Sequence, residues 1–333
     1  MRFGVIGAGA LGGTFAALLE KAGHEVQVTA RGSGLAAILS DGIRLSGGFG
    51  DAHAHPLAAE RLSGGFDLVL VCTKAQDAAA AIAANARVID GTPIVVVQNG
   101  LEGVETVRGL LPNSEVFGAL SIIAANYTEP GVVRVTTKAA SYLGRGSGSP
   151  DAACMHWASV LSEAVPFVAV ANFVGAQWTK LIVNMLNGLP AITGLSVQQV
   201  IADRGLRRAL TASMREAIRV GEARGIRFGT LQGLGNRRLR LIARAPLWLG
   251  QALPLLMGAR MGSVPNLGST QQSIRRGAVT EVDYLNGAIV REAAAVGLRA
   301  PVNERITALV HEVERGEGFL PVQRVVREVL DAR

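Results

Sequence analysis

Hydrophobic residues in the first half of the chain come in short runs, separated by stretches with a helical period. Short apolar or β-branched runs, bounded by glycine, proline or polar residues, are typical of buried strands. Strands that alternate with helical segments indicate a parallel sheet with right-handed crossovers. Runs of this kind lie at residues 3–6, 24–30, 66–72, 93–97, 116–123 and 165–170.

Two further patterns complete the predicted organisation. Segment 129–142 has turn residues and β-branched alternation, so we expect a hairpin that closes the sheet. From residue 176 onward the period is helical and predicts an all-helical second domain. We place the two domains at residues 1–170 and 171–333. The expected helices lie at 176–189, 196–225, 268–297 and 302–315.

A glycine motif follows the first predicted strand. Gly7, Gly9 and Gly12 have the spacing G-x-G-x-x-G, and an apolar helical run comes next. The first glycine allows a tight turn, the second a close approach of a pyrophosphate, and the third close packing of helix on strand. The helix N-terminus offers N–H groups to phosphates. A plain glycine turn is the alternative, but this context favours a Rossmann-type dinucleotide-binding site that includes Ala10 and Leu11.

The end of the second predicted strand bears on the choice of cofactor. An NAD site carries an acidic residue about 20 residues past the glycines, where it binds the ribose 2′-hydroxyl. Here that place holds Thr29, Ala30 and Arg31. No carboxylate would repel a 2′-phosphate, and Arg31 could pair with one. We therefore expect NADP(H); the alternative is that Arg31 is only a solvated side chain.

Composition limits the class of protein. The chain has 333 residues, 49% of them hydrophobic, and a net charge of +7, which suits a packed globular protein with anionic ligands. No basic block is interleaved with aromatic residues, so we expect no nucleic acid partner. The apolar segment 247–259 is shorter than the roughly 20 residues that span a bilayer, so we expect no membrane partner and a cytoplasmic protein.

Candidate chemistry is concentrated in few residue types. The two cysteines and the scattered histidines suggest neither a disulfide framework nor a metal site. Nearly all of the 33 basic residues are arginine, and lysine occurs only at 21, 74, 138 and 180. Lysine can lose its proton near neutral pH in a suitable environment, whereas arginine cannot. Lys180 is followed four residues later by Asn184, so both share one helix face.

These motifs together resemble the ketopantoate reductase (2-dehydropantoate 2-reductase) family over nearly the whole chain. The likeness rests on GAGALG, Arg31, TKAQD, QNG, EPGVV, WTKLIVN, TEVDYLNG and GLRAPVN, in that order and spacing. It implies a Rossmann-type NADP-binding domain followed by an all-helical domain similar to the C-terminal domain of 6-phosphogluconate dehydrogenase. It further implies NADPH-dependent reduction of ketopantoate to (R)-pantoate, in cytoplasmic pantothenate biosynthesis, with a homodimer as one expected assembly.

The resemblance also assigns roles to residues. Lys180 matches the catalytic lysine that gives a proton to the carbonyl oxygen as hydride reaches its carbon, and Glu281 matches the acid that works with it. The other matches are Asn99 near nicotinamide and substrate, Asn184 on the substrate, Ser269 on the substrate carboxylate, and Arg31 and Lys74 near the adenosine phosphate.

Each central assignment has a structural alternative. Lys180 could be a lysine whose stem lies along a helix while its ammonium reaches water. Glu281 could be an acid that stabilises a helix N-terminus. Asn99 could be the first residue of an Asn-Gly turn.

The chain departs from the family pattern at a few places. Gly188 stands where the family often has a second asparagine, with Asn187 one position earlier, and Ser273 replaces an aspartate. Segment 228–267 is longer and more apolar than expected. These departures leave open a paralogous NADPH-dependent reductase of another 2-keto acid, or an opine-type dehydrogenase. A third hypothesis is a regulatory protein that senses NADPH without turnover.

Overall fold

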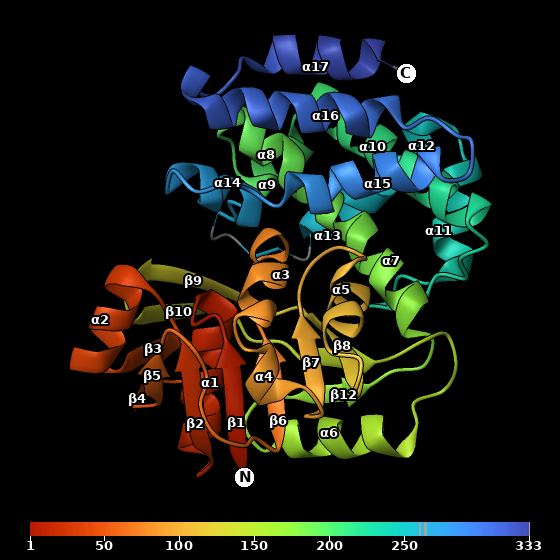
Figure 1. Cartoon of the computed structure of the whole chain (residues 1–333). Coiled ribbons are helices and arrows are strands. Elements are labelled where there is room, and N and C mark those ends of the chain that lie inside the picture. The colour runs from red at the N-terminus through yellow and green to blue at the C-terminus, as the bar shows by residue number, and fades with distance from the viewer. Residues whose placement is uncertain (260, 263–264, 333) are drawn as a thin grey trace. The chain divides into compact units, whose positions relative to one another are not determined.

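The chain forms two compact units, Met1–Phe173 and Val174–Arg333, in the computed structural model of Figure 1. The structure describes residues 1–259, 261–262 and 265–332. The predicted fold class is confirmed, because an α/β unit with a mainly parallel sheet precedes an all-helical unit. Residues 260, 263 and 264 of the apolar segment 228–267 lie outside the described residues.

The first unit is built on an eight-stranded sheet in the order β12-β11-β8-β7-β6-β1-β2-β5. All neighbouring strands are parallel except β8 and β11. The predicted strands therefore form the expected sheet. The strands are β1 (Arg2–Ile6), β2 (Glu25–Thr29), β5 (Leu57–Ala59), β6 (Leu68–Val71), β7 (Ile94–Val97), β8 (Val116–Ser121), β11 (Ser141–Gly144) and β12 (Phe167–Ala169).

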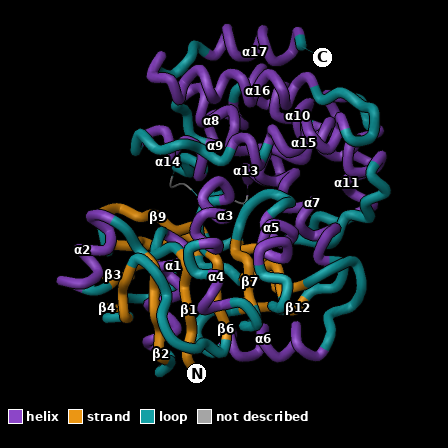
Figure 2. The backbone as a smooth tube through the Cα atoms, in the orientation of Figure 1, coloured by secondary structure: helices purple, strands orange, loops and turns teal. Residues whose placement is uncertain are grey.

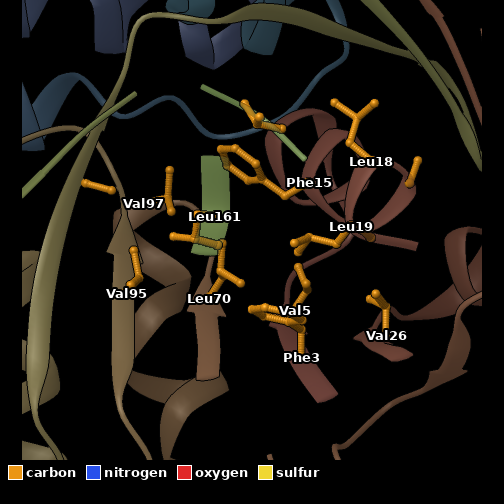
Figure 3. Packing of buried hydrophobic residues seen from close by; sticks show 14 of the residues in the cluster. Phe3, Val5, Phe15, Leu18, Leu19, Val26, Leu70, Val95, Val97 and Leu161 are labelled. Atoms are coloured by element: carbon orange, nitrogen blue, oxygen red, sulfur yellow. The ribbon is translucent and has the colours of Figure 1, made fainter. Parts of the chain in front are cut away.

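Both faces of this sheet are buried, which explains why its strands are continuous apolar runs rather than alternating ones. Val95 and Val97 of β7 belong to one hydrophobic cluster, and Ile94 and Val96 belong to another. Figure 3 shows the first cluster, where side chains of β1, β6 and β7 meet those of α1 and α6. The covering helices are α1 (Ala10–Lys21) and α6 (Ala152–Ser162) on that face, and α3 (Ala75–Ala83), α4 (Ala86–Ile89) and α5 (Gly103–Leu110) on the other.

The hairpin predicted to close the main sheet belongs to a second sheet instead. Strands β9 (Ala124–Glu129) and β10 (Val132–Thr137) pair antiparallel, and β10 also pairs with β3 (Ile43–Gly47), which pairs with β4 (Ala52–Ala54). Val133 lies against α1, since its Cγ2 is 3.0 Å from where a Cβ on Gly13 would lie. The alternating apolar face of β10 is thus buried on a helix, and β11 extends the main sheet.

The second unit contains only helices and turns among its described residues, apart from one isolated bridge (Figure 2). Its longer elements are α7 (Phe173–Asn184), α8 (Gly188–Thr193), α9 (Val197–Ala202), α10 (Arg204–Ala223), α11 (Asn236–Arg244), α12 (Leu247–Gly250), α13 (Ala252–Ala259), α14 (Ser269–Arg275), α15 (Asn286–Ala294), α16 (Pro301–Glu312) and α17 (Val322–Asp331). Three short helical turns join them: η1 (Met185–Asn187), η2 (Val282–Tyr284) and η3 (Val313–Glu317).

The predicted helix 176–189 is interrupted by η1 between α7 and α8, and two other predicted helices are broken by local chemistry. Segment 196–225 divides at Asp203, whose carboxylate accepts the Leu206 N–H and so begins α10. Segment 268–297 divides after α14, where Gly277 has a φ of +62° that a helix cannot continue. The break after α14 places Glu281 in an irregular segment rather than inside a helix.

The apolar segment 228–267 forms α11, α12 and α13, and part of its hydrophobic surface is exposed. Leu241, Trp248 and Leu256 are 69%, 72% and 62% exposed. No described helix is both long and apolar enough to cross a membrane.

Candidate active site

The predicted cofactor-binding residues of the first unit follow four neighbouring strands. The strands β7, β6, β1 and β2 are adjacent and parallel, so their carboxyl ends lie along one edge. The glycine motif follows β1, Arg31 follows β2, Lys74 follows β6 and Asn99 follows β7. The sheet thus brings residues from four distant parts of the sequence to the same edge.

Each glycine of the motif occupies a position with a different constraint. Gly7 has a φ of +96°, and its N–H donates to Thr29 Oγ1 at 3.0 Å. A Cβ on Gly12 would lie 2.0 Å from the Gly7 carbonyl oxygen, so a side chain there is excluded. A Cβ on Gly9 would meet nothing within 4 Å. The space at Gly9 is what a phosphate needs to reach the backbone.

The N-terminus of α1 is suited to an anion. No acidic residue lies in its first turn, and no side chain caps it at Gly9. Its first N–H groups therefore have no intrahelical acceptor and no competing cap. Ala10 and Leu11 are half-buried in this first turn. The residues present fit a dinucleotide pyrophosphate.

Two cationic side chains stand at the starts of neighbouring helices. Arg31 is exposed and precedes α2 (Gly32–Asp41), whose first turn has no acidic residue. Lys74 is half-buried and precedes α3, with Asp77 in the first turn. A cation beside a helix N-terminus favours anions, and at Arg31 no carboxylate of the first turn opposes it.

Side chains to which the sequence assigned no such role connect these loops. Gln98 Nε2 donates to the Thr73 carbonyl oxygen at 2.9 Å, which links the end of β7 to the end of β6. Thr29 links the end of β2 to the glycine turn. Asn99, next to Gln98, is half-buried and precedes Gly100, which has a φ of +87°. Only the strand order reveals these partners, because they are 22 to 25 residues apart.

In the second unit, helix α7 carries Lys180 and Asn184, and contacts of Trp178 and Thr179 anchor this helix. Trp178 is 3% exposed, and the Thr179 hydroxyl donates a hydrogen bond to the Gly229 carbonyl oxygen at 2.7 Å. A Cβ on Gly229 would lie 2.5 Å from the Ala176 nitrogen, so this segment approaches α7 backbone to backbone. Such contacts fix the helix that positions Lys180.

Lys180 and Glu281 interact electrostatically although they are about one hundred residues apart. Burial lowers the pKa of Lys180 to about 8, and the negative charge of Glu281 acts in the opposite direction and raises it. A lysine with this pKa is protonated at neutral pH and still gives up its proton readily. Desolvation and the carboxylate thus act in opposite directions on the pKa of Lys180.

The segment that carries Glu281 is held by backbone hydrogen bonds on both sides of it. The Thr280 N–H donates to Glu314 Oε1 at 2.8 Å, and the Val282 N–H donates to Thr280 Oγ1 at 3.2 Å. Thr280 and Val282 are 3% and 1% exposed, whereas Glu281 between them is half-buried. Its carboxylate is therefore presented from a fixed backbone.

The structure explains the departure at Gly188. A Cβ on Gly188 would lie 2.7 Å from Ile306 Cγ2, so packing on α16 excludes a side chain. The neighbouring Asn187 side chain points toward Gly268 instead. Its Oδ1 lies 2.6 Å from the position that a Cβ on Gly268 would occupy. Asn187 therefore lies at the start of α14, beside the exposed Ser269.

Ser273, the other departure from the family pattern, makes a hydrogen bond within its own helix α14. Its hydroxyl donates to the Ser269 carbonyl oxygen at 3.2 Å, and the side chain is 4% exposed.

Two other kinds of chemistry find no support. Burial raises the pKa of the Cys72 thiol, which opposes a role as nucleophile. Among the residues that the structure describes, no group of three or more potential ligands could hold a metal ion.

A Rossmann-type unit with a glycine turn, followed by a helical unit with a lysine–carboxylate pair, defines a class of two-domain oxidoreductases. The chain belongs to the ketopantoate reductase family within that class. Residues 3–148 match the family model "Ketopantoate reductase PanE/ApbA", and residues 172–314 match "Ketopantoate reductase PanE/ApbA C terminal". The family predicted from the sequence motifs is thereby confirmed.

Individual relatives extend this similarity over the whole chain. The 2-dehydropantoate 2-reductase of Halobacterium salinarum is 30% identical and covers 95% of this chain and 99% of its own. A PanE/ApbA family ketopantoate reductase from Ralstonia eutropha JMP134 has a TM-score of 0.78 at 30% identity, with 95% and 99% coverage. D-mandelate dehydrogenase with NADH and anilino(oxo)acetate has a TM-score of 0.83 at 21% identity, with the same coverage, and shares the fold.

The glycine motif yields a matched pair of variants. Gly9→Ala adds a methyl group into open space, so the free energy of unfolding should change by no more than about 0.5 kcal/mol. Dinucleotide affinity should fall about tenfold, because that methyl group takes the space of a phosphate. Gly12→Ala should instead destabilise the fold by about 2 kcal/mol, because of its contact with the Gly7 carbonyl. Urea unfolding and fluorescence titration with NADPH measure the two effects; equal losses of stability would contradict this assignment.

Proposed function

We propose that the chain catalyses NADPH-dependent reduction of 2-dehydropantoate to (R)-pantoate, with Lys180 as the general acid. The observation that carries this proposal is the charge interaction of half-buried Lys180 with Glu281, in a chain of the ketopantoate reductase family. In this proposal residues 1–170 bind the cofactor and residues 171–333 provide the catalytic side chains. Pantothenate biosynthesis in the cytoplasm, and a homodimer, are the setting that the family suggests.

The proton-transfer step follows from the chemistry of carbonyl reduction. When bound, reduced nicotinamide would supply the hydride that reaches the keto carbon. Negative charge then develops on the carbonyl oxygen, and the Lys180 ammonium stabilises it and donates the proton that completes the hydroxyl group. Neutral Lys180 regains a proton from water. Glu281 keeps Lys180 protonated between turnovers, because its charge raises the pKa that burial lowers.

Substrate recognition requires donors for a carboxylate and a hydroxyl group. Asn99, Asn184 and Ser269 are the residues proposed to bind the substrate, and each can donate to an oxygen. Asn184 lies one helical turn after Lys180 on the same face of α7. The position of Asn187 beside Ser269 supports its addition to this group.

The proposed preference for NADP(H) over NAD(H) depends on the end of β2. Exposed Arg31 stands before α2, and neither that position nor the first turn of α2 carries a carboxylate. A 2′-phosphate would meet a guanidinium and helix N–H groups without a repelling charge. Lys74 is proposed to contribute a second cation to the adenosine phosphate.

A second candidate is reduction of a different 2-keto acid, or an opine-type reaction in which an amine also binds. Gly188 and Ser273 favour it, because Gly188 has no side chain where the family pattern has an asparagine, and Ser273 has no carboxylate where that pattern has an aspartate. A panel of keto acids with and without amines distinguishes these substrates by their kcat/KM values.

Removal of Lys180 tests the assigned acid. With NADPH and ketopantoate, Lys180→Ala should lower kcat by about a hundredfold to ten-thousandfold while NADPH affinity persists. NADPH oxidation followed at 340 nm measures the rate. Efficient reduction of another keto acid but not of ketopantoate would support the paralogue. Tight NADPH binding without turnover of any keto acid would support a regulatory sensor.

The pH dependence tests the charge pair. Reduction needs protonated Lys180, so kcat/KM should fall as the pH rises through about 8. Glu281→Gln removes the charge that raises the Lys180 pKa, so this alkaline limb should move to lower pH. Glu292→Gln on α15, where Glu292 pairs with Arg224, is the matched control and should leave the limb unchanged. A limb that stays in place in Glu281→Gln would be evidence against the pair.

Cofactor choice is tested at the end of β2. Arg31→Ala should raise the KM for NADPH about tenfold, because a charge-assisted contact to phosphate is lost, and should leave the KM for NADH nearly unchanged. Arg44→Ala, on β3 and paired with Asp41, is an exposed arginine control in the same unit. Equal effects on both cofactors would place Arg31 outside the 2′-phosphate site.

A further inference from the structure

We propose that His311 is a positioning residue that holds Glu281 beside Lys180, acting through Asp283 and Glu314. The inference rests on the proposed function in one respect, namely that Lys180 and Glu281 act on the substrate. It adds a residue that no sequence motif points to. His311 lies in the last turn of α16, far along the chain from both members of the pair.

Both ring nitrogens of His311 contact carboxylates. Nδ1 lies 2.6 Å from Glu314 Oε2, and Nε2 lies 3.0 Å from Asp283 Oδ1. A neutral imidazole has a single N–H, so both contacts are hydrogen bonds only when the ring is an imidazolium. Partial burial opposes that charge, but the two carboxylates outweigh it and raise the pKa of His311. His311 thus joins η2 to η3 as a cation between two anions.

Glu314 transmits this contact to the segment that carries Glu281. Its second oxygen accepts the Thr280 N–H at 2.8 Å, so the same carboxylate binds His311 and the residue just before Glu281. Burial would raise the pKa of Glu314, but its hydrogen bonds with Thr280 and His311 outweigh burial and lower it. The Glu314 carboxylate is therefore ionised, and one of its oxygens binds Thr280 while the other binds His311.

Asp283 provides the second point of attachment, two residues after Glu281. Its carboxylate binds His311, and its carbonyl oxygen accepts from Arg291 Nη1 of α15 at 2.9 Å. These contacts bring together the charged groups His311, Asp283, Glu314 and Arg291 from four helical elements, and Arg275 of α14 lines the adjoining cavity. Glu281 lies between two attached residues, and His311 is connected to both attachments.

Packing alone does not hold this segment on every side. A cavity of about 440 Å³ borders it and is lined in part by Gly277, Ala278, Val279, Glu314 and Phe319. Val279 is 66% exposed, so few apolar contacts restrain the chain just before Thr280. Loss of the His311 contacts would remove two attachments of this segment beside the cavity, and we expect Glu281 to shift as a result.

The consequence is measurable at Lys180. If Glu281 moves away, its charge no longer opposes the effect of burial, and the Lys180 pKa falls. His311→Ala should therefore act in the same direction as Glu281→Gln. It should lower kcat about tenfold and leave the KM for NADPH unchanged, since misplacement of a group that assists catalysis affects the chemical step.

The decisive experiment measures the Lys180 pKa directly in the full-length protein. The chain has only four lysines, so an NMR titration of the enzyme labelled with [15N]lysine resolves Lys180, and Lys180→Arg assigns its signal. We expect a lower pKa in His311→Ala, and no further fall when Glu281→Gln is added. Contacts that act through one group are non-additive in such a double-mutant cycle.

Three further variants separate positioning from general stability. Arg324→Ala removes ion pairs with Glu312 of α16 and Glu328 of α17 but none of the His311 contacts, and should leave the Lys180 pKa and kcat unchanged. Glu314→Gln keeps an acceptor for the Thr280 N–H and a donor for neutral His311, so it should retain more activity than Glu314→Ala.

The outcomes distinguish this inference from the proposed function. An unchanged Lys180 pKa in His311→Ala, or additive effects with Glu281→Gln, would overturn the role of His311. A lowered pKa in a protein that reduces no keto acid would sustain the positioning role and reject the proposed reaction.

Discussion

The opposition between burial and charge at Lys180 is the constraint on which the helical unit depends. Burial favours the neutral amine, whereas Glu281 favours the ammonium, and a pKa of about 8 is the balance between them. That balance changes if either side chain shifts by a small distance, because electrostatic energy rises steeply at short range in a dry environment. The hydrogen bonds that anchor α7 through Thr179 and the Glu281 segment through Glu314 therefore help to set this balance.

The α/β unit meets a different requirement, which is to leave backbone groups accessible. Gly7 takes a conformation that side chains rarely adopt, and Gly12 lets α1 come against the glycine turn. Together they leave the N-terminus of α1 open at Gly9. Packing on both faces of the sheet keeps this arrangement rigid, so a phosphate would meet N–H groups that need no reorganisation.

Much of this could be predicted from the sequence, because the signals are local. The continuous apolar runs of β1, β6 and β7 predict strands buried on both faces, and the glycine spacing predicts the turn and helix. The helical spacing of Lys180 and Asn184 predicts a shared face. The sheet that receives the β9–β10 hairpin could not be predicted, since it depends on pairing with β3, a strand with a weak pattern, and on burial against α1.

The sequence by itself thus determined the class of fold, the family, and the residue types available for catalysis, because backbone conformation and helix periodicity depend on near neighbours. Only the tertiary structure decided that Gly188 has no room for a side chain, that Asn187 lies beside α14, and that His311 connects Asp283 to Glu314. The tertiary structure also decided the pKa of Lys180. A pKa depends on how much water is removed and on which charges approach, and packing between residues distant in the sequence sets both.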